Sequence, residues 1–207
     1  PGWHATIFAP YFVAGAIFSG VGMGITLTVP MRKFFGLEAY LTTKHYDAMA
    51  KLCLLTSMIV LYAYMSEFFM AWYSGEEIER TAFWNRLFGD YWWATWIMLV
   101  CNGMVPIMLW FKRVRHSIPA LFVISIFINI GMWFERFVIV VTSLHHEYEP
   151  FAWGMYRPSV IEMMIMVGSF AWFGFWFLLF TRLLPPIAIQ ELKEVLPPPM
   201  RKQKEAH

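Results

Sequence analysis

Charged side chains are scarce in this sequence: Asp, Glu, Lys and Arg make up only 14% of its 207 residues. A soluble domain carries about 25% charged residues, so the composition excludes an ordinary water-exposed surface. Hydrophobic residues instead account for 59% of the chain and aromatic residues for 19%. The net charge of +2 gives no sign of a nucleic-acid partner, because the basic residues gather in loops that mark membrane topology.

Cysteine and well-placed histidine are also scarce. The two cysteines, Cys53 and Cys101, lie alone in apolar segments, so the chain is not expected to hold an iron–sulfur cluster of its own. All six histidines fall at helix ends or in loops, which argues against haem ligation inside a bundle. No zinc-ligand spacing or phosphate-binding glycine loop is present, and we predict no metal site.

Long apolar segments dominate what is present. They cover about 8–30, 48–73, 92–111, 117–143 and 159–182. Each has at least the roughly 20 residues that a helix needs to cross the hydrocarbon core. Outer-membrane barrels have short alternating strands instead, so the sequence predicts an all-α integral membrane protein with five transmembrane helices over residues 1–183. The first segment lacks the basic start and cleavage site of a signal peptide.

The basic residues predict the orientation of these helices. Eleven of them fall on one side of the predicted membrane and three on the other. The eleven are Arg32, Lys33, Lys44, Lys112, Arg113, Arg115, Arg182, Lys193, Arg201, Lys202 and Lys204. Because basic loops stay inside, we expect the N-terminus outside and the C-terminus inside, in a multi-pass protein of a cell membrane.

The two ends of the chain carry further signals. The sequence begins with Pro1 and no Met, so we expect a processed chain or the C-terminal part of a longer one. Residues 184–207 predict a cytoplasmic tail, with a short amphipathic helix at about 187–196 and then three prolines and a basic stretch.

Three ionisable residues lie at predicted membrane depth. Glu67 stands about two turns from the outer end of its helix, roughly 9 Å deep by helical rise, and Arg136 lies at a similar depth. Glu135 is rotated about 100° from Arg136 around the helix, so the two cannot point the same way. Such residues are functional by default. We expect Arg136 to pair with a carboxylate on another helix, leaving the second acid to handle protons; a purely structural ion pair is the alternative.

Other polar residues are weaker candidates. Asn102 and Asn129 are expected to be hydrogen-bonding contacts between helices. His4 is a candidate ligand or proton group at the outer face. A possible proton route enters from the inner boundary, where Asp47 and Lys51 can also simply neutralise each other. The residues of this route are His45, Asp47, Lys51, Tyr62 and Ser66.

Several stretches together resemble one family of membrane subunits. They are PGWHATIFAPYFVAGAIFSG, YMSEFFMAWYSG, DYWWATWIMLVCN, NIGMWFERFVIVVTSLH and LLPPIAIQELK. They are similar to the NrfD/polysulfide-reductase family, and within it to the quinol-oxidising membrane subunit (ActC) of bacterial alternative complex III. Family members are longer, and this sequence resembles their C-terminal half. The resemblance implies a four-helix bundle plus one further helix, in a bacterial inner membrane.

The resemblance also implies a function. Such a subunit has no redox cofactor of its own, binds a quinol, usually menaquinol, near the outer face, and passes electrons to an iron–sulfur subunit and on to multihaem cytochrome c subunits. A paralogous NrfD-like membrane subunit and lipid would be further partners. Arg136 would then belong to the quinol pocket, with His4 near it, and Glu67 and Glu135 would handle protons as the catalytic pair.

Three other readings stay open. A paralogous NrfD-like subunit that moves protons or anchors its partners without quinol chemistry is the first alternative. A purely structural membrane anchor is a second alternative, with Glu67 and Arg136 joining helices. A secondary transporter is the third, although the sequence has no inverted repeat or broken-helix pair.

Overall fold

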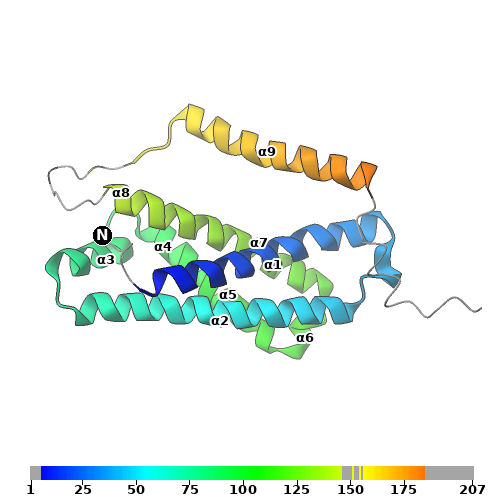
Figure 1. Cartoon of the computed structure of the whole chain (residues 1–207), viewed down its shortest axis with the longest axis horizontal. Helices are drawn as coiled ribbons and strands as arrows, with labels where there is room; N and C mark the ends of the chain where they lie inside the picture. The colour runs from blue at the N-terminus through cyan, green and yellow to red at the C-terminus, as the bar shows by residue number, and fades with distance from the viewer. Residues whose placement is uncertain (1–5, 146–150, 152–153, 155, 185–207) are drawn as a thin grey trace, which may run out of the picture. The chain divides into compact units, whose positions relative to one another are not determined.

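The computed structural model describes residues 6–145, 151, 154 and 156–184 (Figure 1). The chain divides into two compact units, Pro1–Tyr156 and Arg157–His207. Every secondary-structure element in the described residues is helical. The amphipathic helix predicted near 187–196 and His4 lie outside the described residues, as does most of the predicted tail.

Five helical segments are long and apolar enough to span a membrane, which confirms the predicted fold class. They are Phe8–Phe34, Thr43–Tyr73, Trp92–Trp110, Ile118–His145 and Val160–Leu183. The first two are the single helices α1 and α2. The third joins α4 (Trp92–Leu99), η2 (Val100–Met104), α5 (Val105–Ile107) and η3 (Met108–Trp110). The fourth joins α7 (Ile118–Phe137), η4 (Val138–Thr142) and α8 (Ser143–His145). Their orientation in the membrane stays a prediction.

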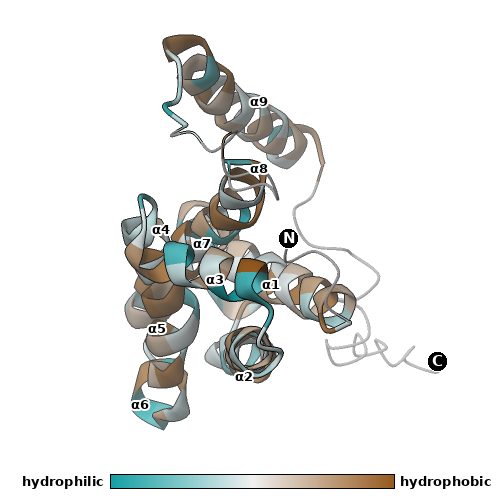
Figure 2. Cartoon of the chain, turned by 90° about the vertical axis from the view of Figure 1, so that its left-hand side faces the viewer, coloured by the Kyte–Doolittle hydropathy of each residue, from teal (hydrophilic) through white to brown (hydrophobic). Residues whose placement is uncertain are grey.

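Four of these spans form the first unit. α1 packs against both α2 and α7, and the third span packs against α7 (Figure 1). Figure 2 shows hydrophilic residues gathered on two short helices, α3 (Glu77–Phe88) and α6 (Lys112–Arg115), whereas the long helices are mostly apolar. Both short helices follow the ends of spans, where side chains leave the apolar region.

The helix α3 was not predicted, because the sequence reads there as a polar loop. Gly75, with φ +70°, turns the chain after α2, a conformation that glycine adopts without steric cost. Glu77 and Glu79 then stand in the first turn of α3 and Arg86 in its last, the charge order that a helix dipole favours. α3 therefore caps the end of the bundle where α2 ends.

The third span is irregular at a definite place. Residues Val100–Met104 form a π-helix, which contains Asn102. Pro106 follows four residues after Asn102 and has no N–H to donate to the Asn102 carbonyl, so the regular hydrogen-bond ladder cannot continue through this turn. A second π-helix, η4, begins three residues after Glu135. Such bulges occur frequently at functional sites.

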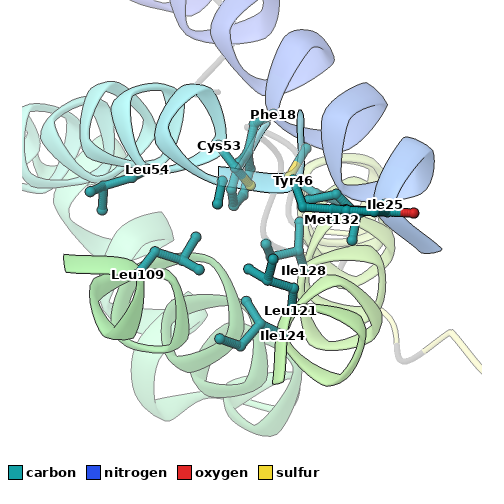
Figure 3. Packing of buried hydrophobic residues seen from close by; sticks show 11 residues of the cluster. Phe18, Ile25, Tyr46, Cys53, Leu54, Leu109, Leu121, Ile124, Ile128 and Met132 are labelled. Carbon is teal, nitrogen blue, oxygen red and sulfur yellow. The ribbon is translucent and has the colours of Figure 1, made fainter. Parts of the chain in front are cut away.

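One apolar core fills the unit toward its basic end, meaning the end with α6 and the last turn of α1. Phe18 and Ile25 of α1, Cys53 of α2, and Ile128 and Met132 of α7 point toward one another there (Figure 3). A second core, around Tyr11, Val60 and Met98, lies toward α3. These two cores fix the helices around the polar residues between them.

Small residues let α1 approach α7 closely. A Cβ built on Gly22 would lie 2.9 Å from the Ile128 side chain, and one on Gly15 would lie 3.4 Å from Met132. Another set of small residues at helical spacing on α1 is Ala16, Gly20 and Gly24. Ala16 and Gly20 are exposed, whereas a Cβ built on Gly24 would lie 3.3 Å from the Met49 side chain of α2. The close contact between α1 and α7 depends on the residues that share the buried face with Phe18.

The second unit contains one described helix, α9 (Val160–Leu183). Ser159 and Glu162 form a capping box at its start: the Ser159 N–H donates to the Glu162 carboxylate at 2.6 Å, and the Glu162 N–H donates to Ser159 Oγ at 3.3 Å. This pattern satisfies two of the free N–H groups at the helix start.

The contact between α7 and η2 yields a first prediction. A Cβ on Gly131 would overlap the Asn102 side chain and lie 2.6 Å from Cys101 Cβ. We expect Gly131→Ala to destabilise the protein by about 1–3 kcal/mol, the usual cost of overpacking. The measurement is thermal unfolding of the purified protein in detergent. Gly20→Ala is the control, because nothing lies within 4 Å of a Cβ there; equal melting temperatures for the two variants would contradict the prediction.

Candidate functional site

A carboxylate, a phenol and an amide meet in the interior of the first unit. Glu135 is only 1% exposed. The Tyr64 hydroxyl donates a hydrogen bond to Glu135 Oε2, and Asn102 Nδ2 lies 3.0 Å from the same oxygen. Asn102 Nδ2 also lies 3.1 Å from the Tyr64 hydroxyl oxygen. These three residues come from α7, α2 and η2, and we call them the buried triad.

The backbone explains how the triad forms. Gly131 lies one turn before Glu135 and admits the Asn102 side chain against the α7 backbone. The π-helix in η2 sets the direction in which Asn102 points. On the other side, the second oxygen of Glu135 faces Gly15 of α1, 3.8 Å from a Cβ built there. Close helix contact therefore surrounds the carboxylate on two sides.

A buried carboxylate between membrane helices is costly unless it is hydrogen-bonded, paired or protonated. Two donors on one oxygen supply the hydrogen bonds that such a group needs. The Tyr11 ring of α1 packs edge-on against Tyr64, with centroids 5.6 Å apart, and holds the phenol in place. The carboxylate of the buried triad is therefore held by specific hydrogen bonds from two other helices.

Arg136 and Glu135 have different main contacts, although both side chains reach Gly15 of α1: a Cβ built there would lie 3.8 Å from Glu135 Oε1 and 4.0 Å from Arg136 Nη2. The Arg136 guanidinium carbon lies 4.2 Å from the centroid of the Phe12 ring on α1, a cation–π contact. Its Nη1 is buried and has no hydrogen-bond partner in the described part of the chain. The same side of α7 carries Asn129, which donates to Thr26 on α1 at 2.8 Å.

Glu67 lies on the wall of an open cavity near the α3 end of the unit. The cavity has a volume of about 620 Å³ and involves the start of α1, the last turns of α2, and α3. Its polar side chains include Tyr62, Ser66 and Glu67 on α2, and Thr6, Ser74, Glu76 and Glu79 line it as well. Its apolar wall includes Ile7, Phe69, Met70 and Phe83.

A second, small cavity of about 20 Å³ adjoins Glu67 on its inner side. Tyr64 of the buried triad lines it, together with Tyr11, Thr95 and Arg86. Glu67 and Phe83 belong to both cavities. Glu67 therefore stands between the open cavity and the buried triad.

Arg86 brings a positive charge to this wall from α3. Its guanidinium carbon lies 4.7 Å from the centroid of the Phe83 ring, and its Nη2 donates to Ser143 Oγ at 3.4 Å. Burial lowers the pKa of Arg86 from its ordinary value, and the nearby charge of Glu67 raises it. An arginine keeps its proton in proteins, so a positive charge faces Glu67.

Of the three ionisable residues predicted to lie together, the structure connects Glu67 and Glu135 through Tyr64. Arg136 is not part of that connection. Tyr64 donates a hydrogen bond to Glu135 and lines a cavity together with Glu67, while the Arg136 guanidinium lies over the Phe12 ring of α1. No ion pair between Arg136 and a carboxylate is present in the described residues, and the cation beside Glu67 is Arg86. The expected pairing differs because α3, read as a loop in the sequence, supplies that cation.

Both predicted asparagine contacts are confirmed. Asn102 and Asn129 donate hydrogen bonds between helices. The role of Tyr64 was missed, although its position three residues before Glu67 places both on one face of α2.

The inner residues of the predicted route form a clamp at the basic end. Asp47 pairs with Lys51 at 2.6 Å, which confirms that these neighbours neutralise each other. Arg115 also reaches Asp47, at 3.0 Å, and its Nη1 donates to the carbonyls of Leu109 and Trp110. This clamp fastens α2 to the end of the third span.

The remaining residues of that route have other surroundings. The His45 Nδ1 accepts the Thr42 N–H at 3.2 Å, so its ring caps α2. Tyr62 is 68% exposed and, with Ser66, faces the open cavity. A continuous inward route along this face of α2 stays a prediction. The described residues also contain no group of three His, Cys, Asp or Glu that could hold a metal ion.

These features define a multi-pass membrane protein with a buried carboxylate site beside an open cavity. A family model described as "Polysulphide reductase, NrfD" matches residues 1–146, well over half of the chain. The chain therefore belongs to the NrfD family, and is a membrane subunit of a redox complex, a setting in which such subunits usually partner iron–sulfur subunits. No curated protein matches the chain by sequence comparison.

The clamp at Asp47 yields a second prediction. Arg115 is 16% exposed, whereas Lys51 is 61% exposed. Arg115→Gln removes three contacts at once, with the Asp47 carboxylate and with the Leu109 and Trp110 carbonyls, and so loosens the join between α2 and the third span. Lys51→Gln removes a surface pair worth about 0–1 kcal/mol. We expect a clearly lower melting temperature for Arg115→Gln; a larger loss for Lys51→Gln would refute the clamp.

Proposed function

We propose that this chain binds a quinol, with menaquinol as the first candidate, in the open cavity beside Glu67, and takes part in its oxidation. The observation that carries the proposal is the position of Glu67 between that cavity and the buried triad. A redox membrane subunit that meets a lipid-soluble electron donor needs a pocket reached from the bilayer, with a proton acceptor on its wall.

The cavity suits such a substrate in size and chemistry. Its volume of about 620 Å³ falls within the roughly 300–1,000 Å³ of small-molecule pockets. The apolar side chains of Ile7, Phe69 and Met70 suit an aromatic head group and its isoprenoid chain. Ser66 and Glu67 offer hydrogen-bonding groups to the ring hydroxyls.

Oxidation of a quinol releases two protons and two electrons. The Glu67 carboxylate is the base on the cavity wall that accepts a proton from a ring hydroxyl. Burial opposes ionisation of this carboxylate and the positive charge of Arg86 supports it, so the group is suited both to accept a proton and to pass it on. The electrons leave to an iron–sulfur subunit and then to multihaem cytochrome c subunits, because no redox cofactor is proposed in this chain.

Glu135 is proposed as the second proton-handling group. It does not line the open cavity, so it receives protons only through residues in between. Its hydrogen bond from Tyr64 provides that connection, since Tyr64 also lines the cavity next to Glu67.

Arg136 is proposed to act from the side of α1. It directly follows Glu135 in the sequence, and its buried Nη1 has no hydrogen-bond partner in the described residues. This positive charge stabilises the ionised form of Glu135 and thereby returns it to the state that accepts protons. Arg136 does not line the open cavity. A direct contact between Arg136 and the quinol, as the family resemblance implies, would need the quinol to reach α1.

A paralogous subunit without quinol chemistry is the second candidate. The buried triad is the observation that favours it, since a proton-handling site in the bundle interior needs no quinol. The two candidates differ in one respect: only the first requires Glu67 to face an occupied cavity.

The exchange Glu67→Gln provides the third prediction. Gln keeps the size of the side chain but cannot accept a proton at neutral pH. We expect quinol oxidation by the intact complex to fall by about a hundredfold or more, the usual contribution of a general base, with loss of the pH dependence that Glu67 contributes. The measurement is the steady-state rate of quinol oxidation between acid and alkaline pH.

Glu77→Gln is the matched control, because Glu77 is exposed on α3 and does not line the cavity. Its rate and pH profile should equal those of the unmodified complex. An unaltered pH profile for Glu67→Gln would remove Glu67 from the reaction and favour the second candidate.

The exchange Arg136→Gln provides the fourth prediction. We expect the complex to assemble and its rate of quinol oxidation to fall, because Glu135 loses the adjacent positive charge. Assembly is measured by the yield of intact complex, and activity is expressed per assembled complex. Loss of assembly with unchanged specific activity would assign Arg136 a structural anchoring role instead.

A further inference from the structure

We infer that the small cavity between Glu67 and Tyr64 binds one water molecule, held by Thr95, and that this water connects the two carboxylates into one proton relay. The cavity volume of about 20 Å³ exceeds the roughly 10–15 Å³ that one water molecule needs. A bound water also needs two to four polar partners. The side chains of the cavity supply them.

The unsatisfied hydroxyl group of Thr95 indicates that this cavity holds a hydrogen-bonding ligand. Thr95 is 1% exposed, yet its Oγ1 has no hydrogen-bond partner in the described part of the chain. Buried hydroxyl groups are almost always hydrogen-bonded to protein or to ordered water. Because Thr95 lines the cavity, a water molecule there is the partner that its hydroxyl can reach.

Two further groups complete the water site. The Tyr64 oxygen donates its proton to Glu135 and receives one hydrogen bond from Asn102, so a second lone pair remains for a donor. Glu67 follows Tyr64 by three residues on the same face of α2 and lines the same cavity. Arg86 stands at the cavity as well, so its guanidinium can also donate to the water oxygen.

The resulting relay is balanced at each step. The Glu67 carboxyl gives its proton to the water oxygen as one water proton passes to the Tyr64 oxygen. The original Tyr64 proton passes to Glu135 Oε2, along the hydrogen bond that already exists. Glu67 ends ionised, Glu135 ends protonated, and the water and Tyr64 return to their starting composition.

Thr95 is a positioning residue in this relay, since it holds the water and exchanges no proton. The rest of the cavity wall consists of Tyr11, whose ring packs against Tyr64, and of five apolar side chains, those of Phe68, Phe83, Met98, Val138 and Ile139. The relay rests on the proposed function of Glu67, whereas the water site rests only on the cavity and its polar groups.

The test uses the intact complex in three forms: unmodified, Thr95→Val and Thr95→Ser. Valine has nearly the shape of threonine without the hydroxyl, and serine retains the hydroxyl. A density map at a resolution that resolves ordered water should show one peak between residues 64, 67 and 95 in the unmodified and Thr95→Ser complexes. That peak should be lost in Thr95→Val.

Infrared difference spectra give a second measurement, independent of activity. Reduction and reoxidation should perturb a water O–H band that shifts in H₂¹⁸O, and this band should disappear in Thr95→Val and return in Thr95→Ser. An empty cavity in the unmodified complex, or a peak unchanged in Thr95→Val, would overturn the inference. If Thr95→Val does not assemble, the map of the unmodified complex decides.

The outcomes also separate this inference from the proposed function. A water peak in a complex whose quinol oxidation does not depend on Glu67 would retain the water site and reject the relay. Quinol oxidation that depends on Glu67 in a complex without the water peak would retain the function and reject the water.

Discussion

The hydrogen bonds on Glu135 are the interaction on which the rest of the structure depends. A carboxylate between membrane helices has no bulk water to solvate it, so the protein must supply its partners. Tyr64 and Asn102 come from two other spans, and each bond therefore also joins helices. The packing of α2, α7 and η2 and the chemistry of the site are consequently one arrangement, and neither can change alone.

Two irregular turns make this arrangement possible. The π-helix at Val100–Met104 redirects Asn102, and the one at Val138–Thr142 follows the turn that carries Glu135 and Arg136. A regular helix would keep its polar side chains in a fixed rotation along the span. Pro106 explains the first irregularity through a missing N–H. For the second, the run of β-branched residues Val138–Thr142 offers no comparable cause.

Much of the fold follows from the sequence, because length and hydropathy determine which segments can cross a membrane. The predicted segment 92–111 and the observed span Trp92–Trp110 differ by a single residue. A short, mostly polar helix at the end of a span gives a weaker sequence signal than a long apolar one. The segment that forms α3 therefore looks like a loop in the sequence. The omission of α3 hid Arg86, so the sequence offered only Arg136 as a cation for a carboxylate on another helix. Depth along a helix can be counted from sequence, whereas the neighbour that a side chain faces depends on packing between spans.

The dependence on packing between spans also explains which parts of the site could be predicted. Rotation within one helix is a local property, so the helical repeat predicts different main contacts for Glu135 and Arg136, although both side chains also reach Gly15 of α1. Which helix each side faces is a property of the whole bundle: Arg136 meets Phe12, and Glu135 meets Tyr64. Tyr64 could have been found as the residue one turn before Glu67, but tyrosines are common enough in these spans that spacing alone does not select it.

Gly131 has a consequence for how this site can vary among relatives. The α7 backbone touches the Asn102 side chain only because position 131 has no Cβ. A relative with a larger residue at 131 must carry a smaller one at 102, and would then lose the amide that binds the carboxylate. The residues at positions 102, 131 and 135 therefore constrain one another. A chain with a different residue at one of them needs another way to solvate the buried acid, or has to do without it.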